Sequence, residues 1–491
     1  DTAEGSLYGK VVDPALARTG VDWTGACATL NVAHQFFTWQ RQVREHAPGS
    51  PELRYDQDLP GVTNHADKTA PWEDDHYYLC GKLEALDCPG EWHLDAEAGT
   101  LYLWPPEGKD LSQCRVEARA RDYALEGDGL RHMEVRGFHF FGCTFRLEEV
   151  EHCVVDGCHL RFPTYSRRIP ELEAERGTSA RTLLSGRNSV VRNCSVAHTP
   201  GEGLTVLGPH NTVDNCLVHG CCWNGSLSYV GVKISARDEA DQEEGGSVVS
   251  RCTVFDTGNT CVHVARMKNC VAERNHIHHG GLMCKDVSLL YTQLPVIEGT
   301  VFRYNWVHDC HPSHIALGIR GDDQTRGLAV HHNVVWNCGW DGIIVKGDRN
   351  LVCNNTCFGN GDCDVLLFSG PEPEKPWRNQ WPLLEEQNAS SRCFNNCAPV
   401  ISSTRGEHRP PGAEASHNCT EGEPRLEDPE RLDFRPRADS PLVNGGREVG
   451  GVTDGHVGDA PDVGAYEHGA PRWLPGCCYA LVVLASPEED G

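Results

Sequence analysis

Short apolar runs recur in one order seven times between Asn188 and about Asn360. Each copy has two or three apolar or β-branched residues, then an Asn or Cys, then a second short apolar run that ends in a polar residue. The copies read NSVVRNCSVAH, NTVDNCLVHG, SVVSRCTVFD, NCVAERNHIHH, GTVFRYNWVHD, GLAVHHNVVWN and NLVCNNTCFGN. Other apolar runs alternate with them: GLTVLG, VGVKIS, CVHVAR, SLLYTQ, ALGIRG, GIIVKG and VLLFSG. Two short strands in each repeat of about 22 to 36 residues predict a solenoid.

The Asn or Cys inside each copy is predicted to point into the solenoid. Equivalent residues of successive coils stack at the strand spacing of about 4.8 Å, so apolar side chains fill the interior and stacked Asn amides hydrogen-bond along the axis. A buried free Cys serves there as a small apolar residue. We interpret this ladder as scaffold and exclude its members from catalysis: Cys194, Cys216, Cys252, Asn275, Asn305, Asn333 and Asn355.

The chain is predicted to be all-β and to have three parts. Residues 1–118 do not repeat and read as an antiparallel β module of barrel or sandwich type. In it, GEWHLDAEAGTLYLWPPEG predicts a hairpin whose aromatic residues Trp92, Tyr102 and Trp104 are expected in the core rather than as sugar platforms. Residues 119–403 form the parallel β-helix. Residues 404–491, rich in Pro, Gly and acids, are expected to cover its open end.

Composition narrows the possible partners. The formal net charge of -26 argues against a nucleic-acid partner, although a local basic groove for an anionic glycan can coexist with an acidic exterior. The apolar run Tyr479–Ala485 is too short to cross a bilayer. The 25 cysteines are odd in number, so at least one lacks an intramolecular disulfide partner. Buried free thiols are the preferred interpretation, ahead of disulfides and then structural zinc.

Polar residues flank the second family of apolar runs. Their starts carry Glu202, Asp286, His314, Asp341 and Asp364, and their ends carry Gln293, Asp322, Asp323, Lys346, Asp348 and Arg349. Equivalent positions of consecutive coils are neighbours, so these acids line one flank beside Tyr291 and Trp340. Glycosidic-bond cleavage needs one carboxylic acid to protonate the leaving oxygen and a second carboxylate to activate water or attack the sugar. Clustered like charges would raise the pKa of one of them.

Turn formation is the competing explanation for these acids, because Asp starts turns and accepts backbone hydrogen bonds. It is preferred for Asp348, Asp362 and Asp364, which stand near Gly. Histidines also concentrate in these coils, but without a defined spacing for metal ligands. His278 and His308 occupy matching positions and are expected to stack, whereas His311 and His314 are candidates for sugar contacts or acid–base work.

The segments KDVSLLYT, GTVFRYNWVHD and GIRGDDQTRGLAVHHNVVW resemble the active-site region of glycoside hydrolase family 141. GEWHLDAEAGTLYLWPP and DVGAYEHG are similar to further segments of such proteins, so the resemblance covers most of the chain. It implies a right-handed parallel β-helix of the pectin-lyase-like type, with catalytic acids at Asp286 and at Asp322 or Asp323. This chain departs from the family pattern at Ser288, where the family has Gly, and in Gly321-Asp322-Asp323-Gln324, where it has Leu-Asp-Asp-Gly.

The leading hypothesis is therefore a glycoside hydrolase that cleaves a plant or algal polysaccharide without a cofactor or metal. Asp286, Asp322 and Asp323 are its catalytic candidates. Such a substrate implies a secreted or periplasmic protein with no membrane or nucleic-acid partner. Contacts with the polysaccharide or oligosaccharide are expected from Tyr291, His311, His314, Arg320, Trp340, Asp341 and Lys346.

Two alternatives remain. A polysaccharide lyase would neutralise a uronate with Lys285, Arg320, Lys346 or Arg349, or with Ca²⁺ held by carboxylates, and would take the proton with His314 or Tyr291. A non-catalytic glycan-binding protein would keep the scaffold alone. Fold does not decide among these functions.

Overall fold

A computed structural model describes residues 9–55 except 33, 34 and 36, and then 76–165, 181–223, 229–311, 315–371 and 381–478. The chain divides into two compact units, the first ending at Asp122 and the second comprising most of the chain from Tyr123 onward. Within the described ranges, no helix has both the length and the apolar character needed to cross a membrane.

The first unit contains an antiparallel sheet of 5 strands in the order β1-β4-β3-β2-β5. Trp23, Leu30, Val43 and Leu53 form its core beside the short helix α1 (Leu16–Thr19). The predicted antiparallel module is thus confirmed, and its first five strands form this one sheet. They are β1 (Lys10–Val12), β2 (Cys27–Val32), β3 (Phe37–His46), β4 (Glu52–Tyr55) and β5 (His76–Cys80).

A separate hairpin of β6 (Trp92–Asp95) and β7 (Thr100–Leu103) follows, between the 3-10 turns η1 (Leu83–Ala85) and η2 (Leu111–Gln113). The prediction that its aromatic residues lie in a core is wrong. Trp92 is 64% exposed, Tyr102 39% and Trp104 44%. A two-stranded ribbon has too little apolar surface of its own to enclose large side chains.

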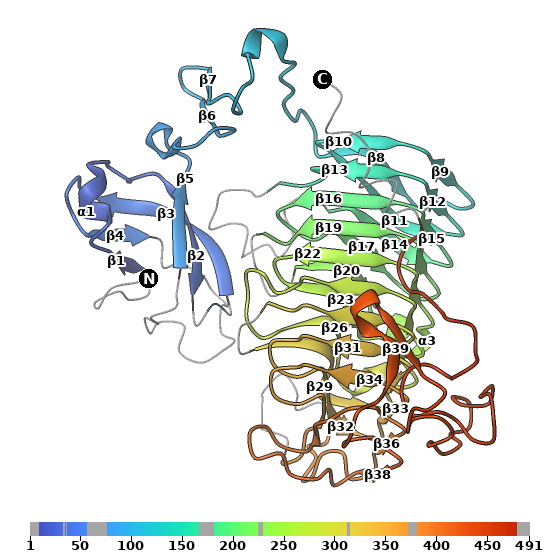
Figure 1. Cartoon of the computed structure of the whole chain (residues 1–491). Helices are drawn as coiled ribbons and strands as arrows, with labels where there is room; N and C mark the ends of the chain where they lie inside the picture. The colour runs from blue at the N-terminus through green and yellow to red at the C-terminus, as the bar shows by residue number, and fades with distance from the viewer. Residues whose placement is uncertain are drawn as a thin grey trace. The chain divides into compact units, whose positions relative to one another are not determined.

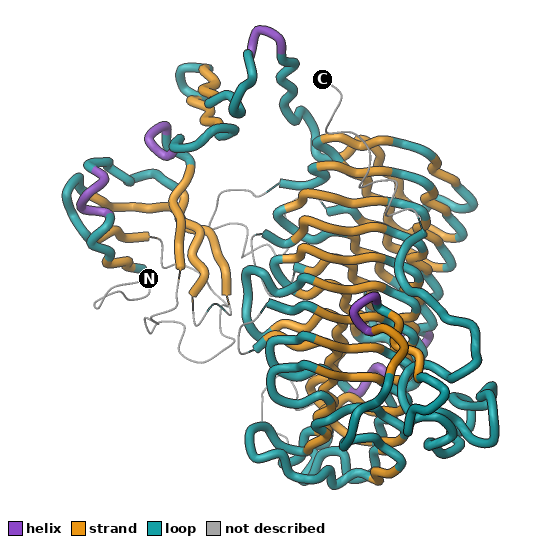
Figure 2. The backbone as a smooth tube through the Cα atoms, viewed as in Figure 1, coloured by secondary structure: helices purple, strands orange, loops and turns teal. Residues whose placement is uncertain are grey.

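The second unit is a parallel β-helix whose strands stack coil upon coil into three sheets (Figures 1 and 2). The first sheet has 11 strands: β8 (Tyr123–Asp128), β11 (Thr144–Glu151), β14 (Leu183–Arg187), β17 (Leu204–Leu207), β20 (Val230–Ser235), β23 (Thr260–Ala265), β26 (Val287–Gln293), β29 (Ala316–Arg326), β32 (Ile343–Asp348), β35 (Val365–Leu367) and β37 (Ile401–Ser402).

The second sheet also has 11 strands: β9 (Glu134–Arg136), β12 (Val154–Asp156), β15 (Val190–Arg192), β18 (Thr212–Asp214), β21 (Val248–Ser250), β24 (Val271–Glu273), β27 (Val301–Arg303), β30 (Ala329–His331), β33 (Leu351–Cys353), β36 (Arg392–Phe394) and β38 (Glu414–Ser416). The third has 9: β10 (His139–Phe141), β13 (His159–Arg161), β16 (Ser195–Thr199), β19 (Leu217–Cys221), β22 (Thr253–Thr257), β25 (His276–His278), β28 (Trp306–His308), β31 (Val334–Trp336) and β34 (Thr356–Phe358).

A full coil therefore has three strands, where the repeat predicted two. Each copy of the first pattern contains two strands, one of the second sheet and one of the third, with the Asn or Cys at the corner between them. The residue before that corner takes a left-handed conformation, as at Asn193 (φ 53°), Asn215 (φ 51°) and Asn354 (φ 50°). One such residue turns the chain sharply enough to divide an apparently continuous apolar run into two strands.

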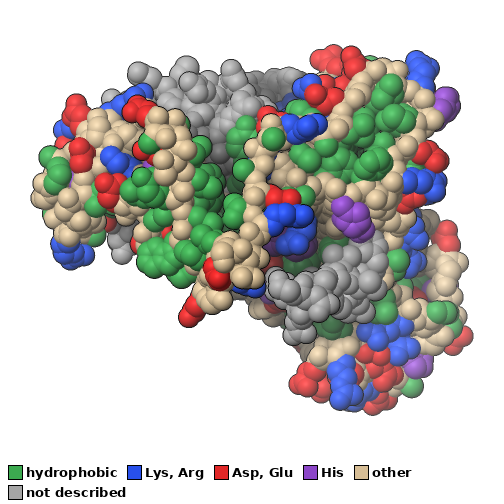
Figure 3. Space-filling model, turned by 90° about the horizontal axis from the view of Figure 1, so that it is seen from above, with side chains coloured by type: hydrophobic (Ala, Val, Ile, Leu, Met, Phe, Trp, Pro, Cys, Tyr) green, Lys and Arg blue, Asp and Glu red, His purple; other side chains and the backbone are tan. Residues whose placement is uncertain are grey.

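Acidic and basic side chains are interspersed over the face seen in Figure 3. On the first coils, Arg146 lies 2.7 Å from Glu126, and Arg136 lies 3.0 Å from Glu134. The described part of this face therefore presents mixed charge.

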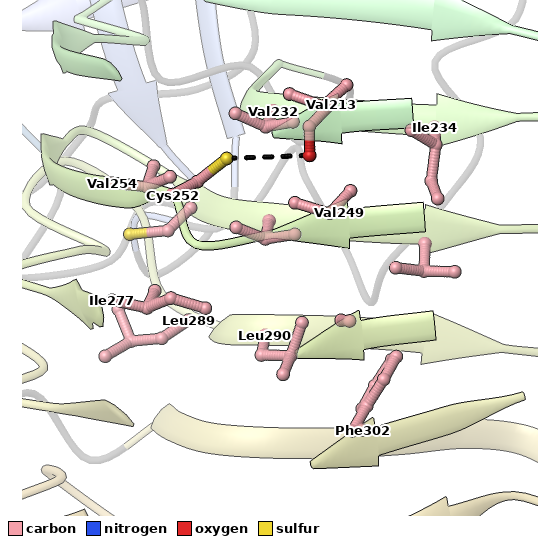
Figure 4. Packing of buried hydrophobic residues seen from close by; sticks show 14 of the residues in the cluster. Val213, Val232, Ile234, Val249, Cys252, Val254, Ile277, Leu289, Leu290 and Phe302 are labelled. Atoms are coloured by element: carbon pink, nitrogen blue, oxygen red, sulfur yellow. Dashed lines mark hydrogen bonds between the residues drawn. The ribbon is translucent and has the colours of Figure 1, made fainter. Parts of the chain in front are cut away.

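Apolar side chains from all three sheets fill the interior of the β-helix (Figure 4). Val213, Val249 and Phe302 come from the second sheet and are 0% exposed. They pack with Val232 and Ile234 of the first sheet. Alternation along short parallel strands places every second side chain inside, so successive coils bury a continuous core.

The predicted ladder at the corner is confirmed. Asn305 Nδ2 donates to Asn333 Oδ1 (2.9 Å) and to the Ala272 carbonyl (2.9 Å), and the Asn275 backbone N–H donates to Asn305 Oδ1 (2.9 Å). The same pattern continues through Asn355 and Asn396 to Asn418. Towards the other end Cys takes the position: the Sγ atoms of Cys194, Cys216 and Cys252 donate to backbone carbonyls at 3.1, 3.3 and 3.2 Å.

Stacked rings form a column on the outside of the third sheet. His278 and His308 pair in register and stack 5.1 Å apart, as predicted, and Phe255 and Trp336 continue the column on either side. Burial lowers the pKa of His276 to about 3, of His278 to about 2 and of His308 to about 4. These imidazoles are therefore neutral in the folded protein.

The C-terminal segment packs along the side of the β-helix. It contains β39 (Leu426–Asp428), η4 (Pro429–Arg431) and β40 (Asp433–Pro436). Phe434 and Tyr466 cover Trp306 of the third sheet, and Trp306 Nε1 donates to the Tyr466 hydroxyl (3.2 Å). Further on, the Cys478 backbone N–H donates to Asn215 Oδ1 (2.8 Å), several coils back. The segment thus links coils that are distant along the axis.

Replacing Asn305 with Ala should lower the free energy of unfolding by about 2–5 kcal/mol, because the Asn275 N–H and the Ala272 carbonyl would lose partners in the interior. Denaturant unfolding followed by circular dichroism measures this change. Thr420→Ala, at an exposed position of the last coil, is the control and should change stability by less than about 0.5 kcal/mol. Equal effects of the two substitutions would contradict the structural role of the ladder.

Stability should fall as the pH drops from about 6.5 to about 4.5, by on the order of 2–4 kcal/mol in total. The folded pKa values of His276, His278 and His308 lie below those of the unfolded chain, so the unfolded state binds more protons in this window. His278→Phe keeps the ring stack, as Phe255 does one coil away, and removes one titrating group. Melting at several pH values should show a shallower loss for this variant, and an identical profile would refute the assignment.

Candidate functional site

The first sheet presents a row of polar and aromatic side chains at one register position. Lys233 on β20 pairs with His263 on β23, which pairs with Tyr291 on β26 and then Arg320 on β29. Two residues further along, Gln293 pairs with Asp322. Because residues i and i+2 of a strand lie on the same face, both rows belong to one face of this sheet.

Arg320 is the centre of this face. Its guanidinium donates 2.7 Å to Asp286 Oδ1 and 2.5 Å to Asp322 Oδ2. Lys346 Nζ lies 2.8 Å from the other oxygen of Asp322. Arg320 is 8% exposed and Asp322 4%, whereas the side chain of Asp286 is 26% exposed. Buried charges persist only when they are paired, and here one cation bridges two carboxylates from consecutive coils.

A bulge in β29 sets the position of the second carboxylate. Gly321 pairs with Val345 and Thr325 pairs with Gly347, so Asp322, Asp323 and Gln324 lie opposite Lys346 alone. Asp323 (φ 50°) and Gln324 (φ 66°) take left-handed conformations. Bulges re-aim side chains and are common beside active sites, and the strain they contain is kept where the surroundings enforce it. Asp323 is buried in this bulge, 3% exposed.

Tyr291 adds an aromatic surface beside the charges. Its ring centre lies 5.6 Å from Arg320 Cζ, and its hydroxyl donates to Gln293 Oε1 (2.8 Å). On the other side its ring is 4.8 Å from that of His263. Burial lowers the pKa of His263 to about 3, so this imidazole is neutral.

Electrostatics separate the roles of the two bridged carboxylates. Among the described residues, ion pairs join Asp322 to Arg320 and Lys346, and Asp286 to Arg320. Burial lowers the pKa of Arg320, but Asp322 and Asp286 more than offset that effect and raise it. The sequence suggested a cluster of like charges. In the structure the Arg320 guanidinium lies between the two carboxylates instead.

Two predicted contact residues lie elsewhere, at the turn before β32. Asp341 accepts hydrogen bonds from Arg405 at 2.7 and 2.9 Å, and Arg405 Cζ lies 3.6 Å from the centre of the Trp340 ring. Burial raises the pKa of Asp341. His311 is exposed as a whole residue. Partial burial of its ring, followed by the positive charge of Lys285, lowers its pKa. His314 lies outside the described residues.

The turn interpretation of two other acids agrees with the structure. Asp348 accepts from the Ser390 N–H (2.7 Å), and Asp364 accepts from the Val400 N–H (3.0 Å). Both hydrogen bonds tie one coil to the next. A carboxylate that satisfies a backbone N–H in this way has a structural role.

A second charge network lies around Glu202, next to the first sheet. The sequence identified Glu202 as a polar residue at a strand start, but it did not predict its partners. Glu202 is 5% exposed and accepts from the Thr205 hydroxyl (2.8 Å). Arg181 and Lys233 lie 3.5 and 3.8 Å from its oxygens. The one signal in the sequence was Lys233, a charged residue inside the apolar run VGVKIS.

Replacing Arg320 with Met should lower the free energy of unfolding by about 3–5 kcal/mol, because two carboxylates would lose their shared cation in a buried place. Arg349→Met is the matched control. Its side chain is 57% exposed and 3.8 Å from Glu298, so its loss should cost less than about 1 kcal/mol. Urea unfolding of both variants measures the difference, and equal stability would show that the bridge contributes little.

Comparisons with known proteins agree with this architecture. Residues 147–318 match the model of the family described as "Right handed beta helix region". A solved chain titled "Glycoside hydrolase" superposes with a TM-score of 0.50 at 15% identity, over 70% of this chain and 70% of that one. The pectate lyase Pel9A superposes with a TM-score of 0.39 at 15% identity, over 66% of this chain and 72% of that one. No curated protein matches the sequence. The chain has the right-handed parallel β-helix fold that its repeats and its family resemblance predicted.

Proposed function

We propose that this protein is a glycoside hydrolase that cleaves a plant or algal polysaccharide with Asp286 and Asp322. The observation that carries the proposal is the pair of carboxylates bridged by Arg320 on the first sheet. The motif resemblance to glycoside hydrolase family 141 supports it, since it maps one catalytic acid onto Asp286 and the other onto Asp322 or Asp323. Of these two, Asp322 is the one that shares Arg320 with Asp286.

The contacts suggest different roles for the two acids. Asp322, with Arg320 and Lys346 against it, suits the carboxylate that activates water or attacks the sugar. The Asp286 side chain is the more exposed of the two (26%, against 6% for Asp322), so a leaving oxygen can reach it, and we assign it the role of the acid. Arg320 fixes the spacing of the two groups. Tyr291 and Gln293 would contact the sugar beside them.

A lyase is the second candidate, favoured by the basic residues of the same face. It requires a cation available to the uronate carboxylate and a base for the proton. Arg320 and Lys346 both pair with Asp322, whose negative charge offsets theirs, and the Tyr291 hydroxyl donates to Gln293. These two observations favour hydrolysis.

A polymeric substrate would place the protein outside the cytoplasm, either secreted or periplasmic. The ladder cysteines are compatible with an oxidising compartment because they are buried. Cys216 and Cys252 are 1% and 0% exposed. Burial raises the pKa of the Cys216 thiol, and a protonated thiol without solvent access does not form disulfides readily.

Asp286→Asn and Asp322→Asn should each lower kcat by about 10³-fold or more, because each removes one of the two required carboxyl roles. Reducing-end release from a panel of polysaccharides and chromogenic glycosides identifies the substrate and then measures turnover. Asp348→Asn is the control, a carboxylate at the end of β32 with a turn function, and should retain turnover.

Circular dichroism should show that the inactive variants fold. Wild-type turnover in both Asp286→Asn and Asp322→Asn would refute the assignment of the site. A rise in ultraviolet absorbance from an unsaturated product would instead establish the lyase reaction.

A further inference from the structure

Three metal-binding side chains meet at the C-terminal coils, away from the Arg320 network. Asp362 and Cys363 belong to the turn before β35, and His408 belongs to the loop after β37. One ligand atom of each lies within 4.8 Å of the others. No sequence spacing pointed to this group, because His408 is brought in by a later coil.

The geometry is close to that of a coordination shell. His408 Nε2 lies 2.8 Å from Asp362 Oδ1, and Cys363 Sγ lies 3.8 Å from Asp362 Oδ2. Tetrahedral zinc with ordinary bond lengths keeps its ligand atoms roughly 3.3–3.7 Å apart. A metal would therefore need the His408–Asp362 pair to open and the Cys363–Asp362 pair to close.

The residues around this group are acidic, and one buried carboxylate oxygen among them has an unmet hydrogen-bonding capacity within the described residues. Asp341 is 0% exposed, and its Oδ1 is buried without a hydrogen-bond partner among the described residues. Arg405 is the cation that contacts Asp341. A divalent cation would offset the remaining negative charge and would stabilise the thiolate.

The donor set selects the class of metal. One imidazole nitrogen, one thiolate and one carboxylate oxygen suit zinc or a similar borderline divalent ion better than Ca²⁺ or Mg²⁺, which prefer oxygen ligands. The His408 side chain is 39% exposed, so solvent can supply a fourth ligand. Cys363 is 0% exposed and anchors the group to the coil.

We propose that Asp362, Cys363 and His408 bind a divalent transition metal of the zinc type. The metal would fasten the loop Thr404–Arg409 to the turn that carries Asp362. That loop contains Arg405, which covers Trp340 and Asp341. The site is independent of the proposed hydrolysis, and it can be tested without a substrate.

The chain contains a matched control site. Asp87, Cys88 and Glu91 form a second group with the same kind of spacing. Glu91 Oε2 accepts from the backbone N–H groups of Asp87 (2.7 Å) and Cys88 (3.1 Å), as Asp362 accepts from the Gly406 N–H (3.3 Å), but this group lacks an imidazole. We expect its removal to leave high-affinity zinc binding unchanged.

Zinc titration of the reduced full-length protein against a chromogenic chelator tests the proposal. Wild type should bind one equivalent tightly, and His408→Ala and Cys363→Ser should weaken that binding by about 100-fold or more. Cys88→Ser should bind like wild type. With Co²⁺ in place of zinc, a thiolate-to-cobalt charge-transfer band should appear in wild type and be absent from Cys363→Ser.

Limited proteolysis tests whether the metal holds the loop Thr404–Arg409 in place. Zinc should slow tryptic cleavage of the Arg405–Gly406 bond in wild type and have no effect in His408→Ala, an exposed position at which folding should be retained. Absence of tight binding in wild type would overturn the proposal. Equal affinity of wild type and His408→Ala, or a cobalt band that persists in Cys363→Ser, would show that other thiols bind the metal and would also overturn it.

Discussion

The amide ladder at the corner between the second and third sheets is the constraint on which the β-helix depends. Each ladder Asn donates to a carbonyl of the preceding coil and to the next Asn, and accepts the backbone N–H of the coil before it. A coil that slipped by one residue would leave these groups unpaired inside the core, and buried unpaired polar groups are costly. The ladder thus fixes the register of the coils from Asn275 to Asn418, including strands of the first sheet that lie far from it.

The candidate site inherits its geometry from that register. Asp286 and Asp322 are distant in sequence, yet one strand spacing brings their coils together and lets Arg320 reach both. The bulge of β29 then supplies what regular stacking cannot, a carboxylate turned towards Lys346. Only the local departure from the repeat is specific to the site. The regular part provides a rigid support for it.

The sequence was sufficient for the features that repetition encodes. The corner residues, the parallel fold and the stacked pair of His278 and His308 all follow from equivalent positions in successive copies. The third strand of each coil and the bulge of β29 each depend on the backbone conformation of single residues, and the sequence did not predict them. A left-handed residue such as Asn193 hides a third strand in an unbroken apolar run, and the bulge at Asp323 has no counterpart in other coils.

Long-range packing was also beyond the sequence. Trp340 and Asp341 occupy the expected strand start, but Arg405 from a later coil contacts them, and periodicity carries no information about that loop. Trp92 alternates like a core residue, yet its hairpin has no described layer over it. Alternation identifies the face of a strand, and it does not say whether anything covers that face.

The two acid–base networks of the first sheet bear on the size of the ligand. Glu202 with Lys233 lies at one end of the polar row, and Asp286 with Asp322 at the other, with the rings of His263 and Tyr291 between them. From β20 to β29 is three strand steps, about 14 Å. In each network the cations are already paired with carboxylates, so the row offers fixed donors and acceptors rather than unbalanced positive charge. Under the function proposed above, such a row would match the hydroxyl groups of an extended, neutral sugar chain better than a single sugar or a run of uronates.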